Sequence, residues 1–177
     1  GEQGDGTINT HALVPHAISG ASFDWNVATP TLNVASGTYF FNQTVTVMNV
    51  MTGVSMHYTT TGGEPTQSDA TIASGTAINV QTSQVVKVKA WKASLPASDT
   101  AVRDYVLKVS TPTISPGGSQ YTTPKTVTLS TTTSGASLYY TVDGSTPTTG
   151  STSYSSPITI STGTVLKVLG AKAGWAN

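Results

Sequence analysis

The chain has 177 residues with eight basic and eight acidic side chains, no cysteine, and Thr or Ser at 54 positions. Zero net charge with scattered basic residues excludes a typical nucleic-acid-binding protein, no apolar run reaches the ~20 residues that insert across a membrane, and the lack of cysteine excludes disulfides and thiolate metal sites. The many β-branched residues, with 17 Gly and 9 Pro, predict an all-β fold.

The N-terminal leader, residues 1–28, contains two short runs of alternating polarity. The first run covers residues 7–14 and is ended by Pro15. In the second run, Phe23, Trp25 and Val27 alternate with polar residues, and its position beside the next segment predicts that it packs there. The residues of the first run that could form a pairing strand are Thr7, Ile8, Thr10, Ala12 and Val14.

The rest of the chain is an internal repeat. Thr29-Pro30-Thr31-Leu32 returns as Thr111-Pro112-Thr113-Ile114, and this offset of 82 residues persists for about 35 positions. After a two-residue deletion the offset becomes 80, where Lys92-Ala93 matches Lys172-Ala173. We therefore expect one domain at residues 29–109 and a second at residues 110–177, after the leader.

Each repeat unit has the pattern of short strands. Val54, Met56 and Tyr58 alternate with polar residues in the first unit, and residues 136–142 do the same in the second. This period of two is typical of a sheet with one buried face. Turn signals such as Asp143-Gly144 separate strands that recur about every 10 residues. The pattern predicts two tandem immunoglobulin-like antiparallel β-sandwiches with an extended N-terminal leader.

Residues 139–148 read Tyr-Tyr-Thr-Val-Asp-Gly-Ser-Thr-Pro-Thr, which resembles the signature of the chitobiase/β-hexosaminidase C-terminal-type domain. The resemblance covers about residues 111–177 well, and it covers 29–109 more weakly because Thr61-Gly62-Gly63-Glu64 replaces Asp-Gly-Ser-x. It implies a small immunoglobulin-like, Fn3-associated, non-catalytic domain of secreted and bacterial cell-surface proteins, often found beside glycoside hydrolases. The expected location is therefore extracellular.

The second unit ends one strand earlier than the first. In the first unit, Ala101, Arg103, Tyr105 and Leu107 share one face of a last strand, whereas the second unit reaches only Asn177. Members of the resembled family normally have that strand, so we expect the second sandwich to lack it and to expose an unpaired edge. The residues expected along this acceptor edge are Val165, Leu166, Val168, Leu169, Gly170 and Ala171.

Three explanations are open for the missing strand. In our leading hypothesis, residues 7–14 of one copy complete the second sandwich of the next by donor-strand complementation, which builds a pilus-like homopolymer. Alternatively, the missing strand lies beyond a truncated end, and the chain is a glycan-binding or spacer module of a secreted glycoside hydrolase or multidomain adhesin, with polysaccharide as a partner. In the third explanation, the leader folds back within its own chain.

The sequence offers little chemistry. Glycoside hydrolysis needs two facing carboxylates, and the spacing places no such pair; nucleophile elbows and phosphate loops are also missing. We expect no catalysis, no cofactor and no metal, because His11 and His16 lack neighbouring carboxylates, and we expect His57 on the surface. The weaker candidates are Trp91, Tyr139 and Trp175 for stacking on a glycan and Asn42 for N-glycosylation.

Overall fold

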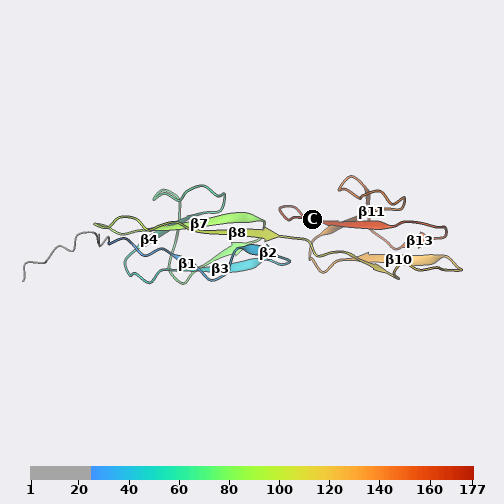
Figure 1. Ribbon diagram of the computed structural model, residues 1–177, viewed down its shortest axis with the longest axis horizontal. Helices are drawn as coiled ribbons and strands as arrows, with labels where there is room; N and C mark the ends of the chain where they lie inside the picture. Colours follow the sequence, from blue (N-terminus) through green and yellow to red (C-terminus); the bar gives the residue numbers. More distant parts are fainter. Residues whose placement is uncertain (1–24) are drawn as a thin grey trace, which may run out of the picture.

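The structure is a computed structural model that describes residues 25–177. Figure 1 shows two β-sandwich units lying end to end along the long axis of the molecule. All the regular secondary structure of the described residues is β-strand, so the prediction of an all-β fold is confirmed. Residues 25–177 contain no helix long and apolar enough to cross a membrane.

The first unit packs two sheets against each other. The larger sheet has five strands in the order β2-β8-β7-β4-β5, and the smaller sheet has three in the order β1-β3-β6. Neighbouring strands are antiparallel, except that β2 runs parallel to β8. The strands are β1 (Thr31–Leu32), β2 (Gly37–Tyr39), β3 (Gln43–Met48), β4 (Ser55–Thr59), β5 (Ala70–Ile72), β6 (Ala77–Val80), β7 (Gln84–Trp91) and β8 (Ala101–Leu107).

The core of the first unit lies between these sheets and is closed by β8. Along β7, buried Val86, Val88 and Ala90 alternate with partly exposed residues, as a sheet with one inner face requires. Tyr105 and Leu107 of β8 are completely buried. The Tyr105 hydroxyl stays hydrogen-bonded by donating to a backbone carbonyl, and burial raises its pKa to about 12. The last strand is thus an integral part of this core.

The second unit repeats this plan with fewer strands. Its sheets have the orders β13-β10-β9 and β12-β11-β14, and each of these pairings is antiparallel. The six strands correspond in order to β1, β3, β4, β5, β6 and β7. They are β9 (Thr113–Ser115), β10 (Lys125–Ser130), β11 (Ser137–Thr141), β12 (Thr152–Ser153), β13 (Ile158–Ile160) and β14 (Lys167–Ala171).

One edge of the second unit differs from the first. β7 pairs with β4 on one side and with β8 on the other, whereas β14 pairs only with β11 among the strands of the described residues. The buried core is correspondingly smaller. Val127, Leu129 and Leu138 are buried, but Leu166 and Val168 remain half-buried where Val86 and Val88 of the first unit are completely buried.

Backbone hydrogen bonds join the two units at a junction. The chain leaves β8 through Val109, and the C-terminal residues return to the same place (Figure 1). The N–H of Ala176 donates to the carbonyl of Leu107 at 2.7 Å, and the N–H of Val109 donates to the carbonyl of Ala176 at 2.8 Å. Ser83 of the first unit donates to the carbonyl of Gly174 at 2.8 Å. The end of the second unit is therefore bonded to the first.

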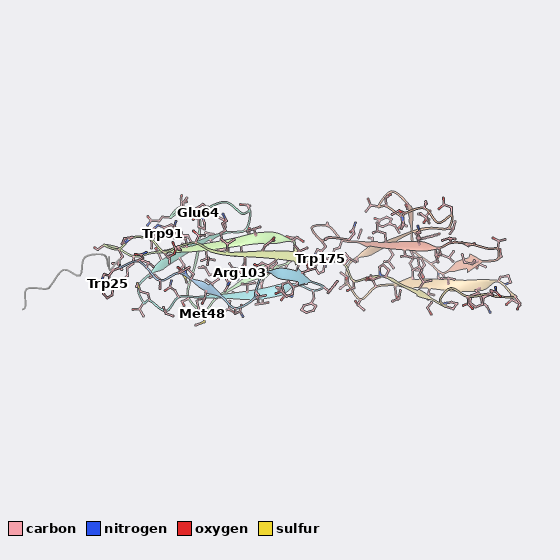
Figure 2. The ribbon with its side chains drawn as sticks, in the orientation of Figure 1. Trp25, Met48, Glu64, Trp91, Arg103 and Trp175 are labelled. Atoms are coloured by element: carbon pink, nitrogen blue, oxygen red, sulfur yellow. The ribbon has the colours of Figure 1, made fainter. Side chains whose placement is uncertain are left out.

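A tryptophan seals this junction. Trp175 is only 9% exposed, its ring belongs to the core of the first unit, and its Nε1 donates to the carbonyl of Gln81 at 2.8 Å. The ammonium group of Lys172 lies 4.3 Å from the ring centroid. Figure 2 shows Trp175 between the two sandwiches. Apolar burial thus adds to the backbone bonds in holding the units together.

The structure corrects two expectations from the sequence. His57 is buried, with 7% exposure, because β5 pairs along the outer side of β4 and Trp91 packs edge-on against the imidazole at 5.4 Å. The run from Phe23 to Val27 was expected to pack on the first unit, and Val27 does so at 2% exposure. Trp25, however, is 79% exposed, and the first two residues of the run lie outside the described residues.

Candidate functional site

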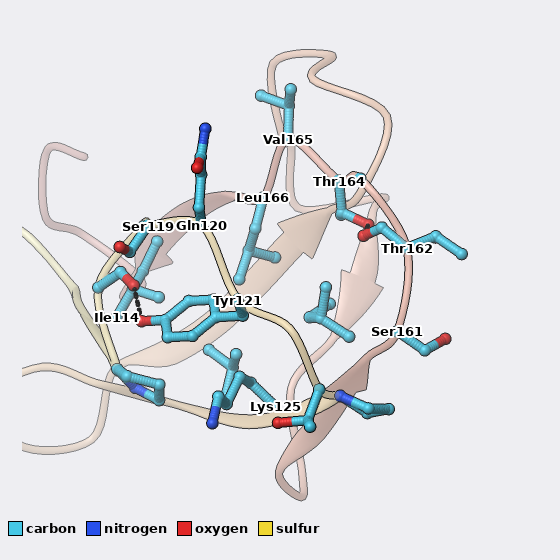
Figure 3. A pocket seen from close by; sticks show the side chains of 18 of the residues that line it. Ile114, Ser119, Gln120, Tyr121, Lys125, Ser161, Thr162, Thr164, Val165 and Leu166 are labelled. Carbon is cyan, nitrogen blue, oxygen red and sulfur yellow. Dashed lines mark hydrogen bonds between the residues drawn. The ribbon is translucent and has the colours of Figure 1, made fainter.

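A groove of about 1010 Å³ opens on the second unit beside its unpaired edge (Figure 3). The loop of residues 116–124 forms one side of the groove and residues 160–166 form the other. Tyr121 lies across it, with its hydroxyl donating to the carbonyl of Gly117 at 2.7 Å. The apolar side chains that line the groove are Ile114, Tyr121, Val127, Ile160, Val165 and Leu166.

The corresponding space in the first unit is filled by β8. Tyr121 corresponds to Tyr39, whose hydroxyl makes the matching bond to the carbonyl of Ala35 at 2.9 Å. The ring of Tyr39 packs against the ring of Tyr105 of β8, with 6.3 Å between centroids. In the second unit the Tyr121 ring is 44% exposed instead. The groove is therefore the counterpart of the space that β8 occupies.

The edge beside the groove is suited to an extended peptide. Val165 is 60% exposed and lies just before β14. One edge of β14 pairs with β11, and its other edge lies on the side of the groove. A sheet edge offers backbone donors and acceptors at regular spacing, and the neighbouring hollow accepts every second side chain of an added strand. The groove thus presents both components of strand recognition.

A small ionic cluster lies on the outer face of the first unit (Figure 2). The carboxylate of Glu64 lies 3.3 Å from Lys89 and 3.6 Å from Lys87, and the hydroxyl of Thr100 also donates to it. The Thr100 hydroxyl, followed by Lys89 and Lys87, lowers the pKa of the Glu64 carboxyl. Glu64 is thus held ionised at neutral pH, which does not suit a general acid.

Two other carboxylates shape turns. Asp69 accepts from the backbone N–H and the hydroxyl of Thr66 at 2.7 and 2.8 Å, and Asp143 accepts from the hydroxyl and the N–H of Ser145 at 2.6 and 3.0 Å. These hydroxyl and backbone donors lower the pKa of both carboxyls. Both carboxylates therefore serve local backbone geometry.

The residues considered for glycan stacking are not equally available. Trp91 is half-buried on the outer face of β7 beside His57, far from the other two along the chain. Tyr139 and Trp175 line one shallow hollow of about 370 Å³. Trp175 is little exposed, because the junction buries it and Lys172 lies over its ring. Tyr139 and Trp91 keep partly exposed rings.

Other sequence-based candidates fall in different surroundings. Asn42 is exposed in the loop before β3, and N-glycosylation there stays a prediction. Residues 7–14, with His11 and His16, lie outside the described residues. Within residues 25–177 there is no group of three or more His, Asp or Glu side chains arranged to hold a metal ion.

The groove residues were the part of the site that sequence reasoning missed. It identified the open edge but not Ile114, Tyr121 or Ile160, which complete the groove. A signal was present, because these residues match Leu32, Tyr39 and Val80 in the repeat, and β8 packs next to them. The groove residues could have been found as the repeat counterparts of the first-unit residues that face the last strand.

A family model described as the chitobiase/beta-hexosaminidase C-terminal domain matches residues 34–102 and 115–177. None of the curated proteins matches the chain significantly. The first matched segment ends at the start of β8. The two segments cover most of both sandwiches, and the chain belongs to the chitobiase/beta-hexosaminidase C-terminal domain family.

Proposed function

We propose that the chain is a rigid, non-catalytic pair of modules in an extracellular carbohydrate-active protein. The junction is the observation that carries this proposal. Three backbone hydrogen bonds and the buried Trp175 ring connect the two sandwiches, so they cannot swing like domains on a flexible linker. Such a pair holds whatever is attached to its two ends at a fixed separation. The family of the chain, named for chitobiases and β-hexosaminidases, supports the carbohydrate context.

The described carboxylates support a non-catalytic role. Glu64 is paired with lysines, and Asp69 and Asp143 are bonded within their own turns. A glycosidase needs one carboxyl group that can hold a proton near neutral pH and a second one across a cleft. We therefore expect no hydrolysis of N-acetylglucosaminide substrates.

A spacer is tested by measuring the distance between its ends. Val50 and Ser119 lie in different units. Spin labels on cysteines introduced at these two positions should give a narrow distance distribution, because the junction holds the units rigidly. Trp175→Ala should broaden the distribution, while Trp91→Ala should not. A broad distribution in the unmodified chain would refute the rigid spacer. Retention on insoluble chitin that is lost in Trp91→Ala or Tyr139→Ala would instead assign a glycan-binding role.

A second function is favoured by the groove. We propose that the chain also serves as the subunit of a homopolymeric filament at the cell surface, in which the leader of one copy fills the groove of another. The half-buried Leu166 and exposed Val165 support this, since an added strand would cover both. The test is negative-stain microscopy of the chain with and without residues 1–15. If the full chain forms filaments and the chain without residues 1–15 does not, the result would support residues 7–14 as the donor.

A further inference from the structure

The start of the described chain has the same local structure as the segment that follows β8. The N–H of Val27 donates to the carbonyl of Pro96 at 3.1 Å, as Val109 donates to the carbonyl of Ala176 at 2.8 Å. Val27 and Val109 are 2% and 4% exposed. The residue after each valine accepts a bond from a corresponding side chain, Asn49 in one unit and the equivalent threonine in the other. Val27 is therefore the structural counterpart of Val109.

Extending this correspondence backward gives a counterpart for β8. The same offset of 82 residues aligns Phe23 with Tyr105 and Trp25 with Leu107. An aromatic residue, a large apolar residue and a valine thus occur at the same period-two positions in both segments. In β8 these positions face the core. The segment before the first unit consequently has the sequence pattern of a last strand, although no sandwich precedes it in the described residues.

We propose that residues 19–25 of one copy form the last strand of the second sandwich of another copy. This assignment deepens the filament function proposed above and rests on it, but it replaces residues 7–14 with a different donor. The exposed Trp25 ring would enter the groove in the way that the buried Leu107 enters the first core. Phe23 would pack against Tyr121 as Tyr105 packs against Tyr39.

The groove is more open than its counterpart at one position where a glycine replaces a serine of the first unit. In the first unit the hydroxyl of Ser83 exchanges hydrogen bonds with the backbone of Leu107, at 2.9 and 3.2 Å. The equivalent position in the second unit is Gly163, and a Cβ added there would meet nothing within 4 Å. A glycine at this position leaves open space beside the backbone of the added strand.

Donation has to occur between copies. Figure 2 places Trp25 at the end of the first unit that faces away from the junction, so the whole first unit separates it from the groove. Residues 19–24 can span about 21 Å when fully extended, which is less than the roughly 26 Å of an eight-residue strand such as β7. The contact joins different surfaces of the two copies, and repeating it produces an open chain of subunits.

The proposed register can be tested by disulfide cross-linking, since the chain contains no native cysteine. Val85 pairs with Asp104 between β7 and β8, and the corresponding residues are Val165 of the acceptor and Ser22 of the donor. Both side chains of this pair in the first unit face outward, so cysteines at the equivalent positions leave the core intact. Ser22→Cys combined with Val165→Cys should give a ladder of covalent multimers on oxidation. Either single variant should give at most a dimer.

The matched controls use the other candidate donor. His11→Cys or Leu13→Cys combined with Val165→Cys should give no ladder. A ladder from these pairs and not from Ser22→Cys would overturn the donor assignment while keeping the filament. If no pair gives a ladder and the 177-residue chain stays monomeric, both ideas are refuted, and a strand from elsewhere, such as one following residue 177 in a longer protein, fills the groove. The rigid spacer is unaffected by either result.

A substitution in the unlabelled chain gives an independent measurement. Phe23→Asp and Trp25→Asp should each raise the concentration needed for assembly by more than about 100-fold, because each would place a charge in an apolar groove. Val50→Asp is the control, since Val50 is an exposed apolar residue, at 89%, that does not belong to the donor strand. Assembly that is unchanged by both donor substitutions would overturn the assignment.

Discussion

Replacing Trp175 by alanine is the sharpest test of the junction. The ring is only 9% exposed, and its Nε1 loses a 2.8 Å hydrogen bond to the carbonyl of Gln81. Truncation of a buried Trp side chain costs about 3–5 kcal/mol, which includes the cavity that remains. Since about 1.4 kcal/mol is a factor of ten, the coupling between the units should weaken by more than about 100-fold.

The consequence is visible in the cooperativity of unfolding. In scanning calorimetry, the monomeric wild-type chain should show one transition, because the second unit cannot unfold without exposing the core of the first. Trp175→Ala should give two transitions, with the second unit melting at the lower temperature. Trp25→Ala is the control, because a tryptophan that is 79% exposed in the monomer should change stability by no more than about 0.5 kcal/mol. A single unshifted transition in Trp175→Ala would refute the coupling.

Three further predictions concern the ionic cluster, the junction loop and the open core. Glu64→Gln should lower stability more at pH 7 than at pH 3. The folded-state pKa of this carboxyl lies below its ordinary value of 4.5. Its contribution to the free energy of unfolding is therefore present above that value and is lost as the pH falls through the folded-state pKa. Urea unfolding at the two pH values measures this contribution, and an equal effect of the substitution at both would contradict the prediction. Gly174→Ala should destabilise the chain more than Gly75→Ala: both glycines have positive φ, but a Cβ at Gly174 would meet a threonine side chain of the first unit at 2.5 Å, whereas one at Gly75 would meet nothing within 4 Å. Equal shifts in melting temperature for the two variants would show that the junction is loose. Ile78→Ala should cost about 2–5 kcal/mol, and Ile158→Ala should cost less in the monomer, because Ile78 is 6% exposed while its counterpart Ile158 remains half-buried. Urea midpoints of both variants check this, and an equal loss would mean that the second core is closed.

The sequence predicted the strands well because their pattern is local. Alternation in residues 54–58 and 101–107 places the same residues inward in the structure, and the repeat offset extends even to matching hydrogen bonds of Tyr39 and Tyr121. Each of these features depends on neighbours within one strand or on a direct comparison of two units. The open edge was predicted by the same comparison, because it requires only the length of each unit.

Contacts between distant segments were less predictable. His57 was placed on the surface because alternation in β4 gives its direction, but not the cover provided by β5 and Trp91. The burial of Trp175 against the first unit was not predicted, because nothing local indicates that the chain end folds back onto that unit. The role proposed for Phe23 and Trp25 rests on a third copy of the strand pattern. That copy becomes clear only from the equivalent hydrogen bonds of Val27 and Val109.

The assembly of the chain depends most on what fills the groove beside β14. Cryo-electron microscopy of assemblies of the 177-residue chain would show this directly. We predict a continuous strand paired along β14, entering from the first unit of the next copy, with a phenyl ring against Tyr121 and an indole ring beside Gly163. A strand with another side-chain pattern, or particles that remain single copies with an empty groove, would contradict the account.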